Sequence, residues 1–277
     1  MRGGRAHLAC FVLAWAFGLA VIPRMRDMME RSGHLRPNYA GRLIPASMGI
    51  PVAISAALAS GLVLTFGGHD AGSSLPCLIL LVACAFAGAV DDVFGSGGSR
   101  GIAGHLRALV RGRVLTTGIL KAALILVFSV LAIHAASPDS KAHLLALDSL
   151  VVALAANFSN LLDLRPGRAS KAYLAGIAAL WLATGLPGPA LVPVSLAGAT
   201  LAGIGDDLAE RSMLGDAGSN PLGAALGYWL VLSTSFAARM VALAALVLVH
   251  LFAERHSITA AIERNPALRF LDALGRK

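Results

Sequence analysis

The chain has 277 residues, of which 57% are hydrophobic and 14% charged, with a formal net charge of +8. Soluble domains carry about 25% charged residues. This composition therefore excludes a soluble globule, a disordered chain, a coiled coil and a secreted disulfide scaffold. Together with a mean hydropathy of +0.74, it predicts an all-α fold: a polytopic bundle of transmembrane helices.

The apolar stretches set the number of expected membrane spans. A helix needs roughly 17–25 apolar residues to cross a bilayer, and about nine segments approach that length. They are approximately 6–22, 46–66, 75–90, 114–135, 143–162, 172–186, 188–204, 221–235 and 237–253. The region 221–253 is too long for one helix and carries Arg239 at its centre, so we expect two helices joined by a turn around residues 233–235. A single helix there would place the C-terminus on the other side of the membrane.

The basic residues predict the orientation. Most Lys and Arg residues fall in alternate loops, beginning with 24–42 and 100–113, and the positive-inside rule places those loops in the cytoplasm. The N-terminus then lies outside, the C-terminus lies in the cytoplasm, and the location is the plasma (inner) membrane. The positive charge follows from this rule, so we expect no nucleic-acid partner. We expect one transmembrane bundle over 1–253 and a cytoplasmic tail over 254–277.

Most of the acidic residues in the apolar region lie at span ends on the predicted cytoplasmic side. They are Asp91, Asp92, Asp163, Asp206, Asp207 and Asp216. Carboxylates at membrane depth are costly and usually functional. Because several of these carboxylates converge on one face, we expect a site for Mg²⁺, which is commonly held by one or two carboxylates and substrate phosphates. For Asp206 and Asp207, a solvated rim is the favoured alternative.

Other polar residues accompany these acids. Asp216 lies in a glycine-rich run at the start of a predicted helix, where free N–H groups favour phosphate. Lys121 lies inside the fourth span and either faces the site or extends to the interface. Asn157, Asn160 and Asp163 share one helix face because they are spaced by three residues. This face either lines a site or forms hydrogen bonds between helices.

Four motifs in this order resemble the polyprenyl-phosphate N-acetylhexosamine-1-phosphate transferases. The motifs are Gly88–Gly95, Leu115–Lys121, Asn157–Asp163 and Leu214–Ser219, and residues 38–45 also resemble the first cytoplasmic loop of that family. The resemblance covers about residues 10–235. It implies Mg²⁺-dependent transfer of a sugar-1-phosphate from a UDP-amino sugar to a polyprenyl phosphate such as undecaprenyl phosphate, with release of UMP, in cell-envelope glycan synthesis.

The resemblance also implies roles for individual residues. Asp91 and Asp92 would deprotonate or position the lipid phosphate, and Lys121 would contact phosphate. Asp216 and Asn160 would be the metal ligands. Asn157 and Asp163 would line the nucleotide site, and Asp163 is counted with the catalytic residues. The remaining substrate-binding candidates are Gly218, Ser219, Arg165 and His256.

The sequence departs from the family pattern at two places. A second aspartate expected shortly after Asp163 is replaced by the basic run that contains Arg165 and Arg168. The histidine-rich loop of the family is reduced here to His256, and the usual tenth helix is absent. The donor sugar therefore stays open. Two other functions compete with the enzyme: a transporter or flippase whose acids bind coupling ions, and a non-catalytic family member that acts as a scaffold.

The tail 257–277 has apolar residues at near-helical spacing, broken at Pro266, with basic residues between them. This pattern predicts an interfacial helix that contacts anionic membrane lipids. The competing interpretation is a segment that binds a partner or forms a homodimer.

Overall fold

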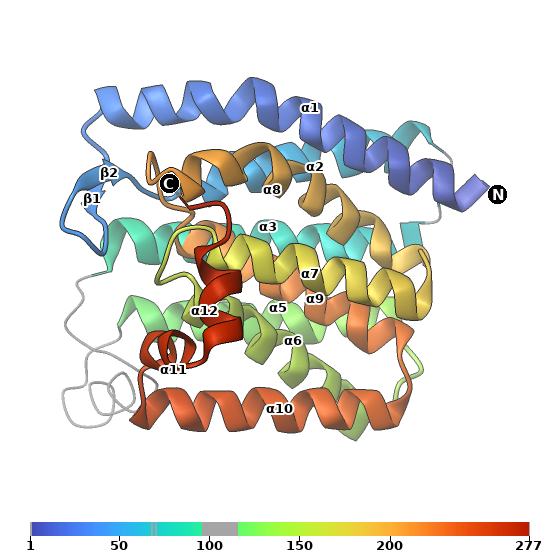
Figure 1. Cartoon of the computed structure of the whole chain (residues 1–277). Coiled ribbons are helices and arrows are strands. Elements are labelled where there is room, and N and C mark those ends of the chain that lie inside the picture. The colour runs from blue at the N-terminus through green and yellow to red at the C-terminus, as the bar shows by residue number, and fades with distance from the viewer. Residues whose placement is uncertain (1, 68, 70, 96–115, 277) are drawn as a thin grey trace.

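The computed structural model describes residues 2–67, 69, 71–95 and 116–276. Within these ranges, nine long helices follow one another along the chain (Figure 1). They are α1 (Arg2–Arg31), α2 (Gly49–Phe66), α3 (Ala71–Phe94), α5 (Thr117–Ala136), α6 (Ala142–Leu162), α7 (Arg168–Thr184), α8 (Leu191–Leu208), α9 (Asp216–Ser233) and α10 (Phe236–Arg255). The shorter elements are strands β1 (Leu35–Pro37) and β2 (Leu43–Pro45), the 3₁₀ turn η1 (Gly188–Ala190), and helices α11 (Ile258–Arg264) and α12 (Pro266–Ala273).

Within the described ranges, seven helices are long and apolar enough to cross a membrane. They are α1, α2, α3, α5, α6, α8 together with η1, and α10. Of the other two long helices, α7 has only 17 residues and α9 carries polar residues in its first turns. The predicted all-α, membrane-embedded bundle is confirmed. The count of nine crossings and the orientation of the termini stay predictions.

The helix boundaries agree with the predicted segments in most places. The region 221–253 is two helices, as predicted, and the break falls at Thr234 and Ser235. The Ser235 hydroxyl accepts a hydrogen bond from the Ala238 N–H and so caps α10. Such a cap satisfies an N–H group that would otherwise lack a partner at the helix start. Helix α1 runs on past Pro23 to Arg31, beyond its predicted end.

The structure adds one element that the sequence did not predict, and it leaves one predicted segment undescribed. The short antiparallel hairpin of β1 and β2, with Leu35 opposite Pro45, was not anticipated from the sequence. The predicted basic loop with Arg100, Arg107, Arg111 and Arg113, together with Leu115 of the second motif and Lys277 of the tail, lies outside the described residues.

Small residues allow the helices to pack closely. Helix α1 packs on α2 and α8, α3 packs on α5 and α9, and α6 packs on α9. A side chain at Gly198 would collide with the backbone of Phe11, and one at Gly223 with the backbone of Ala155. Interhelical packing through small residues is typical of membrane helices, where contact between backbones replaces the hydrophobic effect.

Helix α10 lies at the edge of the bundle and packs mainly against α6 (Figure 1). Its guanidinium at Arg239 forms an ion pair of 2.7 Å with the buried carboxylate of Asp148 on α6. This pair attaches an otherwise exposed apolar helix to the bundle.

Several loops and the C-terminal tail gather at one end of the bundle. The hairpin, the carboxyl end of α3, the tail helices α11 and α12 and the C-terminus lie there, whereas the N-terminus lies at the opposite end (Figure 1). We call this the hairpin end. The loop that precedes α9 is joined to the loop that precedes α2, because Met213 N–H donates to Pro45 and Met48 N–H donates to Met213.

Candidate functional site

A cavity of about 570 Å³ lies at the hairpin end. Its wall is formed by the hairpin, the end of α3, the loop after α6, the end of α8 and the start of α9. Charged side chains from all five segments line it: Arg36, Asp92, Asp163, Arg165, Asp207, Glu210 and Asp216. The cavity therefore presents several carboxylates and two guanidinium groups to one volume.

A lysine joins two of the acids beside this cavity. The Lys121 ammonium on α5 donates to Asp91 on α3 at 2.6 Å and also to Asp216 on α9. When the Asn160 amide is oriented so that both of its groups are satisfied, its nitrogen donates to Asp216 at 2.8 Å and its oxygen accepts from Lys121 at 3.2 Å. Four helices thus contribute one polar cluster, and Asp216 belongs both to this cluster and to the cavity wall.

Asp92 has a different partner from its neighbour Asp91. Its two carboxylate oxygens accept hydrogen bonds from the backbone N–H groups of Asp216, at 2.9 Å, and Ala217, at 3.1 Å. The next two N–H groups of α9, at Gly218 and Ser219, donate to the Gly215 carbonyl. All four N–H groups at the start of α9 are thus satisfied within the protein. This corrects the expectation of free amides for phosphate: the helix terminus already holds an anion, the Asp92 carboxylate, which its dipole stabilises.

Two glycines permit this arrangement. Gly215 has φ +72° and ψ 177°, a conformation adopted essentially only by glycine. A Cβ there would lie 2.7 Å from the Asp92 carboxylate. Gly88 on α3 faces the backbone of Asp216 so closely that no side chain would fit. The glycines of the first and last motifs therefore bring α3 and α9 into contact and place Asp91, Asp92 and Asp216 together.

Asp163 and Asp207 complete the acidic wall. Asp163 follows the last residue of α6, and burial, followed by the negative charge of Asp207 and then of Asp216, raises its pKa well above the usual value. Asp207 is buried and accepts a hydrogen bond from the Gly167 N–H at 3.0 Å. Asp207 therefore belongs to the cavity rather than to a solvated rim. The four acids singled out by the motifs lie together at one end.

Several predicted residues lie away from the cavity wall. Gly218 and Ser219 are buried beneath it, where Gly218 packs against Gly49 on α2. Asn157 is half-buried, one helical turn before the cluster, and is not part of the wall. His256 is exposed beyond the end of α10 and stacks on the Phe252 ring, with the ring centroids 4.7 Å apart.

Arg165 does line the cavity, and its partners were not anticipated. Its guanidinium lies over the Tyr39 ring, 4.6 Å from the centroid. The Tyr39 hydroxyl donates to Glu210 at 2.7 Å, and Asn38 and Arg42 bind the same carboxylate. Glu210 thus fastens the hairpin to the end of α8. No sequence pattern marked it, because its partners come from a loop about 170 residues away along the chain.

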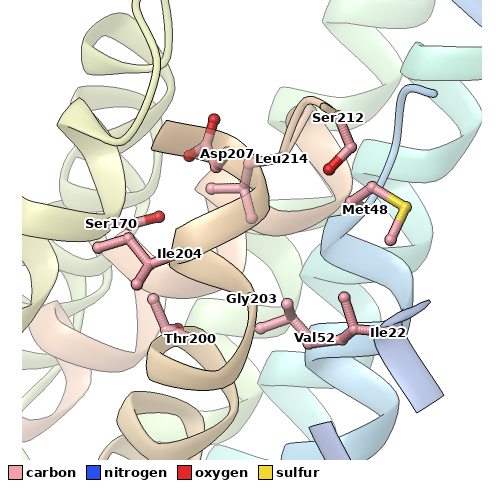
Figure 2. Close-up of a pocket in the computed structure, with 10 residues that line it drawn as sticks. All are labelled: Ile22, Met48, Val52, Ser170, Thr200, Gly203, Ile204, Asp207, Ser212 and Leu214. Atoms are coloured by element: carbon pink, nitrogen blue, oxygen red, sulfur yellow. The ribbon is translucent and has the colours of Figure 1, made fainter. Parts of the chain in front are cut away.

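A second, smaller cavity of about 20 Å³ adjoins the first, and Figure 2 shows the residues that line it. It shares Asp207, Ser212 and Leu214 with the wall of the large cavity, and Ser170 and Thr200 add polar groups. This volume holds about one water molecule.

The donor chemistry of the cluster suits a hard cation. In the described part of the chain, no group of three or more His, Cys, Asp or Glu side chains is arranged to hold a metal. The carboxylates of Asp91 and Asp216, with the Asn160 amide, nevertheless provide oxygen donors. Mg²⁺ is usually bound by one or two carboxylates together with substrate phosphates. The residues therefore fit a metal shared with a phosphate substrate rather than a closed structural site.

No protein-family model matches the chain, and no curated protein matches it.

Proposed function

We propose that this chain is a membrane-embedded phosphoglycosyl transferase. It would transfer a HexNAc-1-phosphate from a UDP-sugar to polyprenyl phosphate on the cytoplasmic face of the membrane and so begin a lipid-linked envelope glycan. One observation carries the proposal. Carboxylates of four distant segments gather with Lys121 at one end of an apolar bundle, beside a cavity of about 570 Å³ that Arg36 and Arg165 also line.

In this proposal the transferred group moves by direct displacement. An oxygen of the lipid phosphate forms a bond to the β-phosphorus of the UDP-sugar, and the bond from that phosphorus to the oxygen bridging to UMP breaks. UMP leaves with the bonding electron pair. Such reactions depend mainly on positioning and on stabilisation of charge. Arg36 and Arg165 would bind phosphate oxygens because guanidinium groups match their geometry.

The polar cluster supplies the remaining roles. Asp216 and Asn160 would hold Mg²⁺, which supplies neutralisation of the diphosphate charge when bound. Lys121 would remain beside Asp91 and contact a phosphate oxygen, and Asp91 would accept the proton of the lipid phosphate. Asp92, whose oxygens are hydrogen-bonded to α9, would act by positioning Asp216.

The transporter alternative is less well supported by the placement of the acids. Coupling-ion sites of transporters lie near the bilayer midplane, often at interrupted helices. Here Asp91, Asp163 and Asp216 lie at helix ends. This placement favours a substrate that approaches from the aqueous side, as a nucleotide sugar does.

The decisive experiment measures UMP release by the detergent-purified full chain. Undecaprenyl phosphate, a panel of UDP-sugars and Mg²⁺ are supplied, and parallel samples contain a chelator. We expect Mg²⁺-dependent UMP release with at least one donor and its loss in Asp216→Asn. Asp27→Asn is the matched control, because Asp27 is an exposed aspartate on α1 outside the cavity wall. Absence of UMP release with every donor, from folded protein, would refute the transferase.

A further inference from the structure

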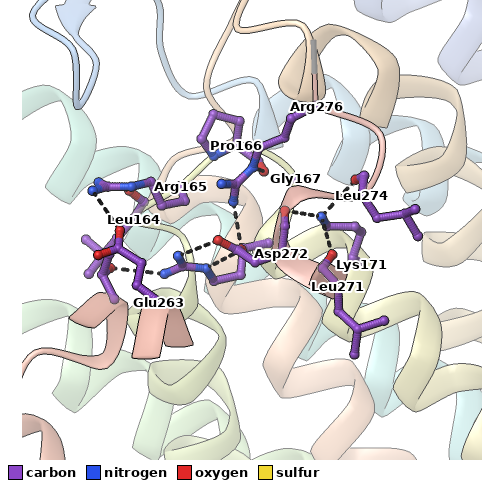
Figure 3. Close-up of polar contacts among 12 residues, drawn as sticks. Leu164, Arg165, Pro166, Gly167, Lys171, Glu263, Leu271, Asp272, Leu274 and Arg276 are labelled. Atoms are coloured by element: carbon purple, nitrogen blue, oxygen red, sulfur yellow. Dashed lines mark hydrogen bonds and ion pairs between the residues drawn. The ribbon is translucent and has the colours of Figure 1, made fainter. Parts of the chain in front are cut away.

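The C-terminal tail folds back onto the hairpin end, and the carboxylate of Asp272 is at the centre of its polar contacts there. The Arg168 guanidinium, at the start of α7, binds both oxygens of Asp272 on α12, at 2.7 and 3.0 Å. Arg276 donates to the same carboxylate at 2.7 Å (Figure 3). Two-point binding of this kind is among the stronger hydrogen-bonded ion pairs.

Apart from Asp272, the side chains of α12 make little contact with the rest of the protein. Of residues 263–275, every one except Asp272 is exposed. Lys171, one turn into α7, donates to the carbonyl groups of Leu271, Asp272 and Leu274 at the end of α12 (Figure 3). The helix α12 is therefore attached by its polar side, through Asp272 and its own terminal carbonyls, while α11 is held by a hydrogen bond of 3.1 Å from Arg168 to Thr259 and by Ile258, which packs on the core.

The attachment point is also the wall of the large cavity. Arg168 directly follows the loop 163–167, of which residues 163–166 line the cavity. The Arg276 guanidinium donates to the Pro166 carbonyl at 3.0 Å (Figure 3). The contacts of Arg168 with Asp272 and of Arg276 with Pro166 therefore join the tail to one wall of the candidate site.

The opposite side of α12 is apolar and uncovered. Phe270, Leu271 and Leu274 are 68%, 56% and 54% exposed. Arg168 and Lys171 lie in the first turn of α7, just after the loop that follows the membrane-length helix α6, so their bonds place α12 near the level where α6 ends. Exposed apolar side chains at that level, next to exposed Arg264 and Arg269, complement a surface of anionic lipid.

We propose that α12 binds the membrane surface and the cavity wall at the same time, and we call it the clamp. Its apolar side lies in the interface of an anionic bilayer, which we call the lipid seat, and its polar side holds the segment 163–168 in place through Asp272. Asp272 and Arg168 are then positioning residues for the cavity. The effect of the clamp on turnover rests on the proposed transferase function, but the seat and the attachment can be measured without turnover.

The lipid seat is tested with the full chain carrying Phe270→Cys and a fluorescent label. The three native cysteines are buried, so the label reports on the introduced site. The protein is placed in bilayers of neutral or phosphatidylglycerol-rich lipid that carry a quencher near the head group. We expect loss of fluorescence from the labelled tail, stronger in the anionic bilayer. Glu30→Cys, at the exposed end of α1, is the control and should be quenched less.

Two results would overturn the lipid seat. One is equal quenching at positions 270 and 30. The other is energy transfer between labelled tails of two chains without quenching by lipid, which would mean that a second copy covers this face.

The attachment is tested with Asp272→Asn. Hydrogen bonds that involve charged groups are strong enough that losing this pair should raise the detached fraction of the tail about tenfold or more. The measurement is the rate at which trypsin removes a C-terminal epitope, and a spin label at Leu164→Cys should gain mobility in the same background. Glu263→Gln, whose ion pair with Arg165 is 3.9 Å long and exposed, should leave both unchanged. Unchanged cleavage and mobility in Asp272→Asn would overturn the clamp.

Discussion

Replacing Lys121 by methionine removes the only described cation that bridges Asp91 and Asp216 while keeping a side chain of similar length. The side chains of the three residues are 12%, 18% and 22% exposed. Removing one member of a fully buried pair costs about 3–5 kcal/mol. Because some solvent reaches these groups, we expect a loss of about 2–3 kcal/mol in the free energy of unfolding.

The assay is thermal unfolding of the detergent-purified protein without divalent cations. At roughly 2–4 °C per kcal/mol for a chain of about this size, Lys121→Met should lower Tm by about 4–12 °C. Lys141→Met serves as the control, because Lys141 is exposed at the opposite end of α6. Mg²⁺ should restore more stability to Lys121→Met than to the unaltered chain, since a ligand that binds only the folded state stabilises it.

The reasoning about the polar cluster would be refuted by a Tm of Lys121→Met equal to that of Lys141→Met. It would also be refuted if Mg²⁺ shifted both proteins by the same amount, because the two carboxylates would then not form a cation site when the ammonium is removed.

Four further tests address other parts of the structure. Gly215→Ala should cost about 1–3 kcal/mol, and Asp92→Ala about 1–2 kcal/mol for the lost helix cap; chemical denaturation measures both, and Asp92→Asn should retain part of the cap. For Asp272, burial alone would raise the pKa, but the hydrogen bonds and charge of Arg168 outweigh it, so the folded pKa lies below the ordinary 3.8. Tail attachment should therefore be complete above pH 3.8 and lost as pH falls through the folded pKa, as a spin label on the tail would report; Asp272→Asn should show no such transition. Arg239→Met should destabilise the chain more than the double variant Arg239→Met/Asp148→Leu, because the single change leaves a buried carboxylate unpaired; equal unfolding midpoints would contradict this account.

The gathering of the motif residues could be anticipated because each acid lies at the end of an apolar segment. When helices alternate in direction across a membrane, the side of every helix end follows from counting segments. Asp91, Asp163 and Asp216 were therefore expected at one end, and the structure places them there. The break before α10 was likewise indicated locally, by polar residues that interrupt an apolar stretch.

The partner of each side chain could not be anticipated in the same way. Asp91 and Asp92 are adjacent in sequence, yet one contacts Lys121 and the other caps α9, because successive residues on a helix point in different directions. Glu210 and Asp272 became important through contacts with Asn38 and Arg168, which lie far away along the chain.

Apolar length and hydropathy are properties of each segment alone, so a membrane-embedded helical bundle could be inferred from the amino-acid sequence. The sequence also shows which helix ends carry acids. The packing of the helices sets which carboxylate contacts a lysine, which one accepts hydrogen bonds from backbone amides, and how the tail contacts the cavity wall. These contacts depend on how each helix is rotated and how closely the helices approach one another. Glycines such as Gly88 and Gly215 permit the close approach, but their presence in the sequence does not show which helices meet.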